Sequence, residues 1–419
     1  MTLRARIHRG AAQVGGNCVE LEAAGQRILL DLGMPLDAQD GEVPLPDVAG
    51  LTSPDPSLLG IVISHLHGDH CGLVPHVRPD IPLAMGPVAA RILREAEFFT
   101  GREPLPEPRW PLRDREPFEI GPFRITPYAV EHSAIDAFAL LVEVGGRRLF
   151  YTGDFRAHGN DRSPFERLVR DPPRDVHAML MEGTQIGEGR EGEGPGEDAL
   201  RATLTRRFQE WPGLVLAAWS SQNLDRTRTF HEAARDAGRT LVVDLYTATL
   251  AAAAKAPGVP VPGDVGLQVY CRLRERIQVK AARAFERTSG VRGARVFPEE
   301  LSRRAGELVL MLRPSMIREL DRAGALEGAL AIWSMWRGYL SQPTERRMVD
   351  CLAQCSVPLE VHHVSGHAYV RDLRRLVNAV RPDRVIPIHT AEPSRYARTI
   401  PGTSAQLDGA WWTVGRGFS

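Results

Sequence analysis

The chain contains 419 residues, and its 52 basic residues (Lys and Arg) equal its 52 acidic residues (Asp and Glu), so the formal net charge is zero. At about 150 residues per domain, this length predicts two or three domains. A content of 43% hydrophobic and 25% charged residues is typical of a globular protein and excludes a disordered or fibrous chain. The neutral total excludes a protein that binds nucleic acid through bulk positive charge, although a local basic surface stays compatible with it.

Cysteine usage and hydropathy indicate the compartment. The five cysteines are scattered along the chain, which favours a reducing compartment over a disulfide framework. The N-terminal segment MTLRARIHRGAAQVGG lacks the apolar core of a signal peptide, and no apolar run approaches the roughly 18–20 residues of a membrane-spanning helix. We therefore expect a cytoplasmic protein with no membrane partner.

The first 180 residues predict short strands separated by turns rich in glycine and proline. One helix is predicted over 87–99, with a proline in its first turn, where a missing N–H is tolerated. The clearest predicted strands are 27–33, 60–64, 123–130, 138–144 and 147–154.

The pattern changes after the Gly- and Glu-rich stretch 188–197, which is typical of a linker between modules. Strands and helices then alternate, which predicts a small parallel α/β unit that continues into long Arg-rich helices. The elements expected in this half are strands at 214–219 and 240–245, a helix from about Asn223, a helix over 369–380 and a final buried strand over 383–389.

The strongest chemical signal is the segment Ser-His-Leu-His-Gly-Asp-His at 64–70, directly after an apolar strand. His65, His67, Asp69 and His70 stand in a loop at the carboxyl end of that strand, where they can converge on one point. Imidazole and carboxylate ligands suit zinc or manganese, and the absence of thiolates favours a catalytic over a structural site. The alternative, a polar loop with incidental histidines, fits such a dense cluster poorly.

Further candidates stand at the ends of other predicted strands. His132 follows 123–130, Asp154 closes 147–154, His389 closes 383–389 and Asp31 closes the strand that begins at 27. A lone strand-end His or Asp is usually structural, but four in succession favour one shared site.

These residues make the sequence resemble the metallo-β-lactamase superfamily and, within it, the β-CASP nucleases of the ribonuclease J type. The narrower match rests on MEGT at 181–184, on Ser221, Gln222 and Asn223 with Arg226, and on HVSGHA at 363–368 followed by PIH at 387–389. The resemblance implies an α/β fold, an αββα sandwich with an inserted β-CASP α/β domain. The expected boundaries are 1–195 for the first part of the sandwich, 196–345 for the insertion and 346–419 for the C-terminal part.

The resemblance also implies the metal ligands. It assigns His65, His67 and His132 to one divalent ion, Asp69, His70 and His389 to a second, and Asp154 to both. Zinc is the expected metal and manganese the alternative. Asp69, Asp154, Glu182 and His367 form the implied catalytic set, in which His367 supplies a proton or contacts phosphate. Glu182 fits equally well a role in orienting a ligand histidine.

The implied substrate contacts are Ser221, Asn223, His363, Ser365, Gly366 and His367, although Ser221 and Asn223 also suit helix capping. The implied activity is hydrolysis of phosphodiester bonds in single-stranded RNA, as a 5′→3′ exonuclease, an endonuclease or both, because His389 accompanies RNA-processing members. The alternatives are a DNA-directed or small-substrate hydrolase on the same site, and a non-catalytic nucleic-acid-binding scaffold. A homodimer is also an open alternative.

Two features concern the insertion. The segment 271–304 contains ten basic and four acidic residues, which fits either a solvated helix face or the lining of a nucleic-acid channel. The sequence departs from the family pattern at 312–320 and 332–340, and we expect no further domain after it. These departures affect the expected pocket for the 5′ end of the substrate, so an altered substrate is an open alternative.

Overall fold

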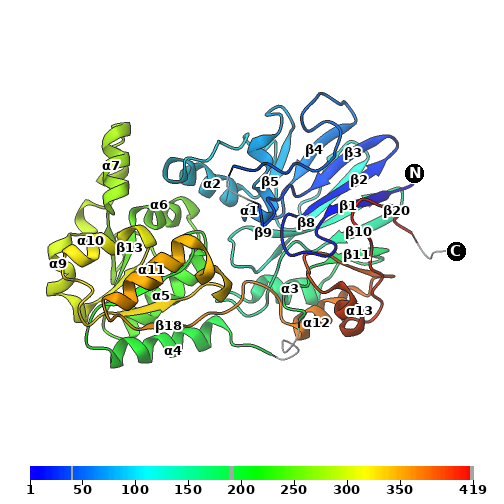
Figure 1. Ribbon diagram of the computed structural model, residues 1–419. Coiled ribbons are helices and arrows are strands. Elements are labelled where there is room, and N and C mark those ends of the chain that lie inside the picture. The colour runs from blue at the N-terminus through cyan, green and yellow to red at the C-terminus, as the bar shows by residue number, and fades with distance from the viewer. Residues whose placement is uncertain (39–40, 188–192, 416–419) are drawn as a thin grey trace. The chain divides into compact units, whose positions relative to one another are not determined.

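The computed structural model describes residues 1–38, 41–187 and 193–415, which form two compact units (Figure 1). Unit 1 comprises Met1–Glu97, Arg102–Gly194 and Gly366–Ser419, and unit 2 comprises Phe98–Gly101 and Pro195–Ser365. A sandwich interrupted by an inserted α/β domain, as the sequence predicted, is therefore confirmed. The first half of the predicted linker at 188–197 lies outside the described residues.

Unit 1 is built on two β-sheets within its described ranges. The first sheet is antiparallel from β20 to β3 and parallel from β3 to β6. Its strands, in order across the sheet, are β20 (Trp411–Thr413), β1 (Arg4–Arg9), β2 (Cys18–Ala23), β3 (Gln26–Leu30), β4 (Leu58–Val62), β5 (Leu83–Met85) and β6 (Trp110–Pro111). Helix α1 (Gly68–Cys71) follows β4, and α2 (Pro87–Thr100), which confirms the helix predicted over 87–99, follows β5.

The second sheet is parallel from β19 to β10 and antiparallel from β10 to β7. Its strands, in order across the sheet, are β19 (Val385–Pro387), β11 (Ala178–Met181), β10 (Arg147–Tyr151), β9 (Ala137–Val144), β8 (Phe123–Val130) and β7 (Phe118–Ile120). The helices that belong with it are α3 (Ser163–Arg170), α12 (Val370–Val380) and α13 (Pro393–Thr399).

The two sheets of unit 1 share one apolar core. Ile7 of β1 and Leu140 of β9 both lie in it, fully buried. The opposite face of the second sheet packs on α3 and α12 in a separate cluster that includes Leu141 of β9 and Leu373 of α12. Because both faces of β9 are covered, its sequence AFALLVEV is apolar almost throughout, where a half-exposed strand would alternate with polar residues.

The strands that precede the motif residues end at one edge of the sandwich. In the second sheet β10, β11 and β19 run parallel, and in the first sheet β3 and β4 run parallel with Leu30 opposite Val62. The amide of Phe138, at the start of β9, donates to the carbonyl of Ser64 at 3.0 Å. This bond joins the two sheets at that edge, so residues far apart in sequence meet there.

Unit 2 contains a wholly parallel sheet in its described residues, which confirms the predicted parallel α/β unit. Its strands, in order, are β15 (Arg295–Val296), β14 (Leu267–Tyr270), β13 (Thr240–Asp244), β16 (Leu308–Met311), β12 (Val215–Ala218), β17 (Leu330–Trp333) and β18 (Leu359–Val361). One apolar cluster joins the sheet to α4 (Glu197–Glu210), α5 (Leu224–Asp236) and α6 (Leu245–Ala254). A second cluster joins it to α10 (Ile317–Arg322) and α11 (Pro343–Gln354).

The return from unit 2 to unit 1 lies between Ser365 and Gly366, later than the expected boundary at 345. The boundary lies later because α11 and β18 both belong to unit 2. Helix α11 packs in a core of unit 2, and β18 extends the sheet of unit 2 by pairing in parallel with β17. The sequence of 346–363 has the same strand–helix rhythm as the elements on either side of it, so composition does not mark this crossing.

Long Arg-rich helices are expected after the strand 240–245, but the most basic stretch there, 271–304, contains no long helix. This stretch forms α7 (Leu273–Ala282) and the short helices α8 (Glu286–Ser289) and α9 (Pro298–Arg303). Arg283 ends α7 in the left-handed conformation, with φ of 54°, and Gly290, Gly293 and Pro298 disfavour a continuous helix beyond it. Part of the positive charge is paired, since Arg276 contacts Glu319 at 2.6 Å.

None of the helices in the described ranges combines the length and apolar character needed to cross a membrane.

A buried ion pair connects several elements of unit 2. Arg226 in α5 and Glu197 at the start of α4 are fully buried, and Nη2 of Arg226 donates to Oε1 of Glu197 at 2.8 Å. Arg226 also donates from Nη1 to the carbonyl of Ser334 at 2.9 Å and from Nη2 to the carbonyl of Val364 at 2.8 Å. These contacts offset the loss of hydration that burial of the two charges entails.

We expect Arg226→Met to lower the free energy of unfolding by about 3–5 kcal/mol, because the substitution leaves the Glu197 carboxylate buried without its cation. Urea unfolding followed by circular dichroism measures this change. The double variant Arg226→Met/Glu197→Leu removes both charges and should recover part of the loss. A single variant within about 1 kcal/mol of the wild type would show that the pair does not stabilise unit 2.

Candidate metal centre

The motif segment 64–70 passes from the end of β4 into the single turn of α1. Its backbone packs closely on a neighbouring loop, because a Cβ atom at Gly33 would lie 1.7 Å from the carbonyl oxygen of Asp69. Gly33 and Asn17 are also joined to this region by backbone hydrogen bonds: the amide of Asn17 donates to Asp69 at 3.0 Å, and that of Gly33 donates to Asn17 at 2.9 Å. The close approach fixes where Asp69 and His70 leave the strand end.

The first group of potential ligands consists of His65, His67 and His132, whose nearest ring nitrogens lie within 4.8 Å of one another. Nε2 of His132 is 3.1 Å from Nδ1 of His67. Burial lowers the pKa of His67 to about 4, and burial together with the neighbouring imidazoles holds the pKa of His65 and His132 well below the usual value. All three rings are therefore neutral near pH 7, which is the form that binds a metal.

The second group consists of Asp69, His70, Asp154 and His389. Oδ2 of Asp154 is 3.1 Å from Nε2 of His70, and Oδ2 of Asp69 is 3.2 Å from Nε2 of His389. Burial opposes charge on both carboxylates, but the surrounding histidines outweigh it and lower the pKa of Asp69 and of Asp154. Oδ2 of Asp154 also lies 3.8 Å from Nε2 of His65, so this carboxylate stands between the two groups.

A third group shares Asp154 and His389 with the second and adds Glu182 and His367. Nδ1 of His367 is 3.2 Å from Oε2 of Glu182 and 3.7 Å from Oδ2 of Asp154. Burial disfavours a charged His367, but the carboxylates of Glu182 and Asp154 outweigh it and raise the pKa of His367 to about 9. Glu182 is fully buried and accepts a hydrogen bond from the amide of Ala368 at 3.2 Å, so it also holds the loop that carries His367.

A set of outer contacts fixes which ring nitrogen each histidine turns toward the cluster. Nδ1 of His70 is 2.7 Å from Oδ2 of Asp31, Nδ1 of His132 is 2.6 Å from the carbonyl of Gly366, and Nδ1 of His389 is 2.7 Å from Oγ1 of Thr184. Each contact leaves Nε2 directed at the other potential ligands. Such partners set tautomer and ring orientation in metal sites.

Asp31 has the densest of these contacts. Its Oδ1 accepts from the amide of Ser64 at 2.7 Å, and its Oδ2 accepts from the hydroxyls of Ser64 at 2.8 Å and Tyr151 at 2.6 Å, in addition to His70. Asp31 and His389 both have positive φ, of 60° and 54°. A non-glycine residue in this region is strained, and such strain is typical of functional sites.

The donor atoms fit a divalent metal. Nε2 of His65 and Oδ1 of Asp154 are buried, and neither has a hydrogen-bond partner among the described residues. Buried polar atoms without a partner are rare, and each needs an explanation such as an ion. Imidazole nitrogens and carboxylate oxygens are the ligands of zinc in catalytic sites, where thiolates are not required. The structure therefore brings together all seven predicted metal ligands in an arrangement suited to divalent metal.

The predicted substrate-contact residues fall in different places. Ser221 shares a hydrogen bond of 2.8 Å with Thr247 and accepts one from Arg313, while Asn223 caps α5 by accepting from the amide of Arg226 at 2.9 Å. Both belong to unit 2, where they make the contacts that helix capping and internal packing require.

The HVSGHA segment spans the crossing between the units. His363 and Ser365 belong to unit 2, and Nδ1 of His363 lies 3.2 Å from the carbonyl of Ser334. Gly366 and His367 belong to unit 1, where both contact members of the metal centre.

The sequence patterns indicate Asp31 and Glu182 but not the other side chains that orient the histidines. Thr184 lies in the MEGT motif and Tyr151 in the strand before Asp154, and neither pattern assigns them this role. Asn17, whose Nδ2 donates to the hydroxyl of Tyr151 at 3.2 Å, lies outside every motif. The sequence feature that could have indicated Asn17 is the pair of glycines before it, Gly15 and Gly16. Glycines permit a close approach of the backbone, and this turn lies close to Asp69.

Comparison with family models agrees with this geometry. Residues 26–196 match the beta-lactamase superfamily domain, and residues 357–400 match the Zn-dependent metallo-hydrolase RNA specificity domain. Together with the fold and the seven converging donors, these matches show that the chain contains the domains of a metallo-β-lactamase-type hydrolase of the β-CASP kind. Its class is that of the metal-dependent hydrolytic nucleases.

Curated relatives extend the match to most of the chain. It is 24% identical over 408 residues to the Ribonuclease J of Mycolicibacterium smegmatis, and 25% identical over 426 residues to that of Mycobacterium tuberculosis H37Rv. Each alignment covers 92% of this chain and 68% of the relative. A crystal structure of a protein of unknown function from Enterococcus faecalis V583 shares the fold, with a TM-score of 0.78, 19% identity, and coverage of 99% of this chain and 100% of the other.

We expect Gly33→Ala to lower the metal content of the purified protein, because the added Cβ would meet the backbone of Asp69 and displace that residue. Elemental analysis after loading with zinc measures the effect. Gly68→Ala is the matched control, since a Cβ atom at Gly68 has nothing within 4 Å although Gly68 adjoins Asp69. Equal metal content in the two variants would contradict the proposed role of the close approach.

We expect Asp31→Asn to weaken metal binding by about 10–100-fold, because the new amide group would face the donors that now converge on the carboxylate. Competition with a zinc chelator measures the affinity. Asp55→Asn is the control: Asp55 likewise accepts bonds from the amide and hydroxyl of a serine, Ser57, but lies outside the metal centre. Unchanged affinity in Asp31→Asn would show that ring orientation does not depend on this carboxylate.

Proposed function

We propose that the protein is a metal-dependent ribonuclease that hydrolyses phosphodiester bonds of single-stranded RNA with two bound divalent ions. The observation that carries the proposal is the convergence of two neighbouring groups of donors, His65, His67 and His132 in one and Asp69, His70 and His389 in the other. Oδ2 of Asp154 lies 3.8 Å from His65 of the first group and 3.1 Å from His70 of the second. Seven nitrogen and oxygen donors with one shared carboxylate are enough to hold two ions and leave positions open.

In this proposal the first three histidines would hold one ion, Asp69, His70 and His389 would hold the other, and Asp154 would be available to both. Zinc fits the donor set, and manganese is the alternative. Bound divalent ions supply two things: water that ionises near neutral pH, and positive charge that stabilises the transition state of a phosphodiester. The remaining chemistry falls to the side chains of the chain itself.

His367 is the proposed proton donor for the leaving oxygen. It lies beside Asp154, and the carboxylate of Glu182 at 3.2 Å orients its Nδ1 and keeps the ring protonated, so Nε2 carries the proton that can be transferred. Glu182 itself is buried and hydrogen-bonded to the backbone, which supports an orienting role over direct proton transfer.

Two findings favour RNA as the substrate. The segment 357–400, which matches the RNA specificity domain, contains both His367 and His389, and the curated relatives aligned over most of the chain are named Ribonuclease J. His363, Ser365 and Gly366 of the HVSGHA segment are the further proposed contacts for phosphate oxygens. We propose both exonuclease and endonuclease action, because nothing in the donor set restricts the enzyme to one mode.

We expect the zinc-loaded protein to cleave labelled single-stranded RNA to products with 5′-phosphate ends, and to lose this activity with chelator or in Asp154→Asn. Linear RNAs with 5′-monophosphate or 5′-triphosphate ends and a circular RNA distinguish the modes, since only an endonuclease opens the circle. His76→Gln, outside the metal centre, is the control. Cleavage of DNA with inert RNA would favour the DNA-directed alternative, and bound RNA with no hydrolysis would favour the scaffold.

We expect His367→Ala to reduce RNA cleavage by about 10²–10⁴-fold, because the leaving oxygen loses its proton donor. Hydrolysis of bis(para-nitrophenyl) phosphate should change far less, since its leaving group departs without protonation. Metal content is measured in parallel. Equal losses on both substrates, with metal retained, would contradict the role of proton donor.

A further inference from the structure

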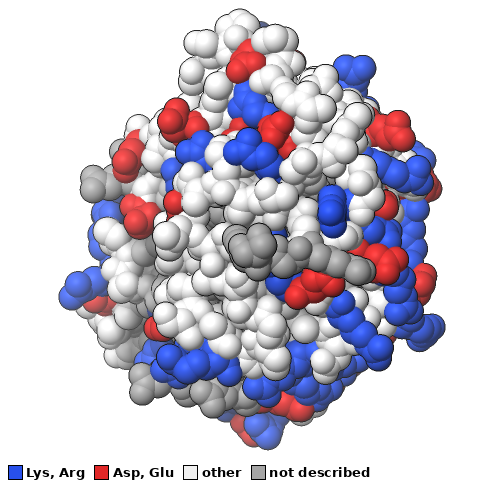
Figure 2. Space-filling model, turned by 90° about the vertical axis from the view of Figure 1, so that its right-hand side faces the viewer, with Lys and Arg blue, Asp and Glu red and all other residues white. Residues whose placement is uncertain are grey.

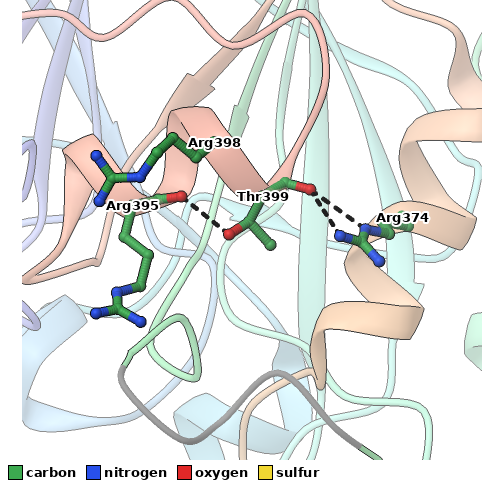
Figure 3. A pocket seen from close by; sticks show the side chains of 4 residues that line it. All are labelled: Arg374, Arg395, Arg398 and Thr399. Atoms are coloured by element: carbon green, nitrogen blue, oxygen red, sulfur yellow. Dashed lines mark hydrogen bonds between the residues drawn. The ribbon is translucent and has the colours of Figure 1, made fainter.

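Helices α12 and α13 of unit 1 form a pocket of about 390 Å³ that is lined by Arg374, Arg395, Arg398 and Thr399 (Figure 3). None of these residues belongs to the groups that could hold a metal. Arg374 extends from α12, whereas Arg395 and Arg398 stand one turn apart on α13. Three of the four lining residues are therefore arginines, and no acidic residue is among them.

Arginines of α12 that lie outside the pocket form ion pairs with carboxylates. Arg371 contacts Glu193 at 2.6 Å, and Arg375 contacts Glu166 at 2.8 Å and Asp372 at 3.2 Å. In the part of the chain that the structure describes, no carboxylate lies within ion-pair distance of Arg374 or Arg398. The carboxylates near α12 thus pair with Arg371 and Arg375 outside the pocket, and none of those described pairs with Arg374 or Arg398 inside it.

The pocket is organised by hydrogen bonds before any ligand arrives. Nε and Nη2 of Arg374 donate to the carbonyl of Thr399 at 3.2 and 3.1 Å, and the hydroxyl of Thr399 donates to the carbonyl of Arg395 at 2.9 Å, as the dashed lines in Figure 3 show. A carbonyl orients a guanidinium but does not cancel its charge. Like charges held around one concavity repel one another, and an anion in their midst would relieve that repulsion.

The chemistry of the lining identifies the kind of anion. Guanidinium groups bind phosphate in bidentate fashion, and several together on one site are typical of phosphate recognition. All four lining residues lie within the segment 357–400 that matches the RNA specificity domain. Figure 2 shows one face of the molecule, on which basic side chains gather along the lower part with few acidic ones between them.

We propose that the pocket of Arg374, Arg395, Arg398 and Thr399 binds a backbone phosphate of the RNA substrate at a position separate from the metal centre. The inference rests on the proposed function, because it takes RNA as the substrate. The contact carries no sequence information; it adds affinity and fixes the path of the strand. An RNA too short to reach both the metal centre and the pocket gains nothing from it.

The test measures binding by fluorescence anisotropy of the zinc-loaded enzyme, with a labelled RNA of about 20 nucleotides whose 2′-hydroxyls are methylated to slow cleavage and whose phosphates are intact. We expect Arg395→Gln/Arg398→Gln to raise the Kd about five- to tenfold. The plot of log affinity against log salt should become shallower by about 0.7 for each phosphate that the variant no longer binds. A four-nucleotide RNA should bind both proteins equally.

The control is Arg371→Gln/Arg381→Gln, which removes the same net charge from α12 and its C-terminal end outside the pocket. This control should leave the salt dependence close to that of the wild type. Equal weakening by both double variants, or no weakening by the pocket variant, overturns the proposal. Thermal unfolding of each variant verifies that it is folded, and Arg398→Gln alone replaces the double variant if that one is not.

Two further measurements distinguish an RNA phosphate from a free anion, and the pocket from the metal centre. Titration with inorganic phosphate by calorimetry tests for a free anion: phosphate binding that the pocket variant abolishes, with RNA affinity unchanged, overturns the proposal in favour of a small-anion site. Hydrolysis of bis(para-nitrophenyl) phosphate requires the metal centre but not the pocket. If the wild type hydrolyses this ester but neither binds nor cleaves RNA, both the proposed ribonuclease function and the proposed phosphate site are wrong. If the wild type binds RNA and the pocket variant binds it equally well, only the proposed phosphate site is wrong.

Discussion

The geometry of the metal centre depends on the hydrogen bonds of the Asp31 carboxylate. This carboxylate accepts hydrogen bonds from the backbone and hydroxyl of Ser64 at the end of β4 and from Tyr151 at the end of β10, and it fixes His70. These strands belong to the two different sheets of the sandwich. One buried group therefore sets both the spacing between the sheets at this edge and the orientation of a ligand ring. Its own backbone strain is tolerated because several donors would lose their acceptor if it relaxed.

The sequence indicates the seven candidate ligands because their positions at strand ends depend on local rules. A buried strand delivers the next residue to the sheet edge, and parallel strands deliver their ends to the same edge. His65, Asp154 and His389 all follow strands in this way, so a pattern of apolar runs followed by His or Asp was sufficient to predict them. The same rules predicted β3, β4, β8, β9, β10 and β19 of unit 1 and β12 and β13 of unit 2, because covered sheets require nearly continuous apolar runs.

What the sequence could not supply is long-range pairing. The contact of Thr184 with His389 joins residues 205 positions apart, and that of Tyr151 with Asp31 spans 120 positions, so no local pattern encodes either one. The late return from unit 2 has a related cause: β18 belongs to unit 2 only because it pairs with β17, and its three residues carry no mark of that partner. The expectation of long Arg-rich helices fails in 271–304 for a different reason. The charge pattern of this stretch suits a helix, but its glycines and its proline disfavour a long one.

The chain returns from unit 2 to unit 1 between Ser365 and Gly366, and side chains hold the backbone on both sides of this point. Arg226, deep in unit 2, fixes the carbonyl of Val364, and two residues later the carbonyl of Gly366 fixes the ring of His132. A run of three peptide groups thus connects a buried charge of one unit to a ligand of the other. The backbone between Val364 and Gly366 is thus held at one end by a guanidinium of unit 2 and at the other by an imidazole of unit 1.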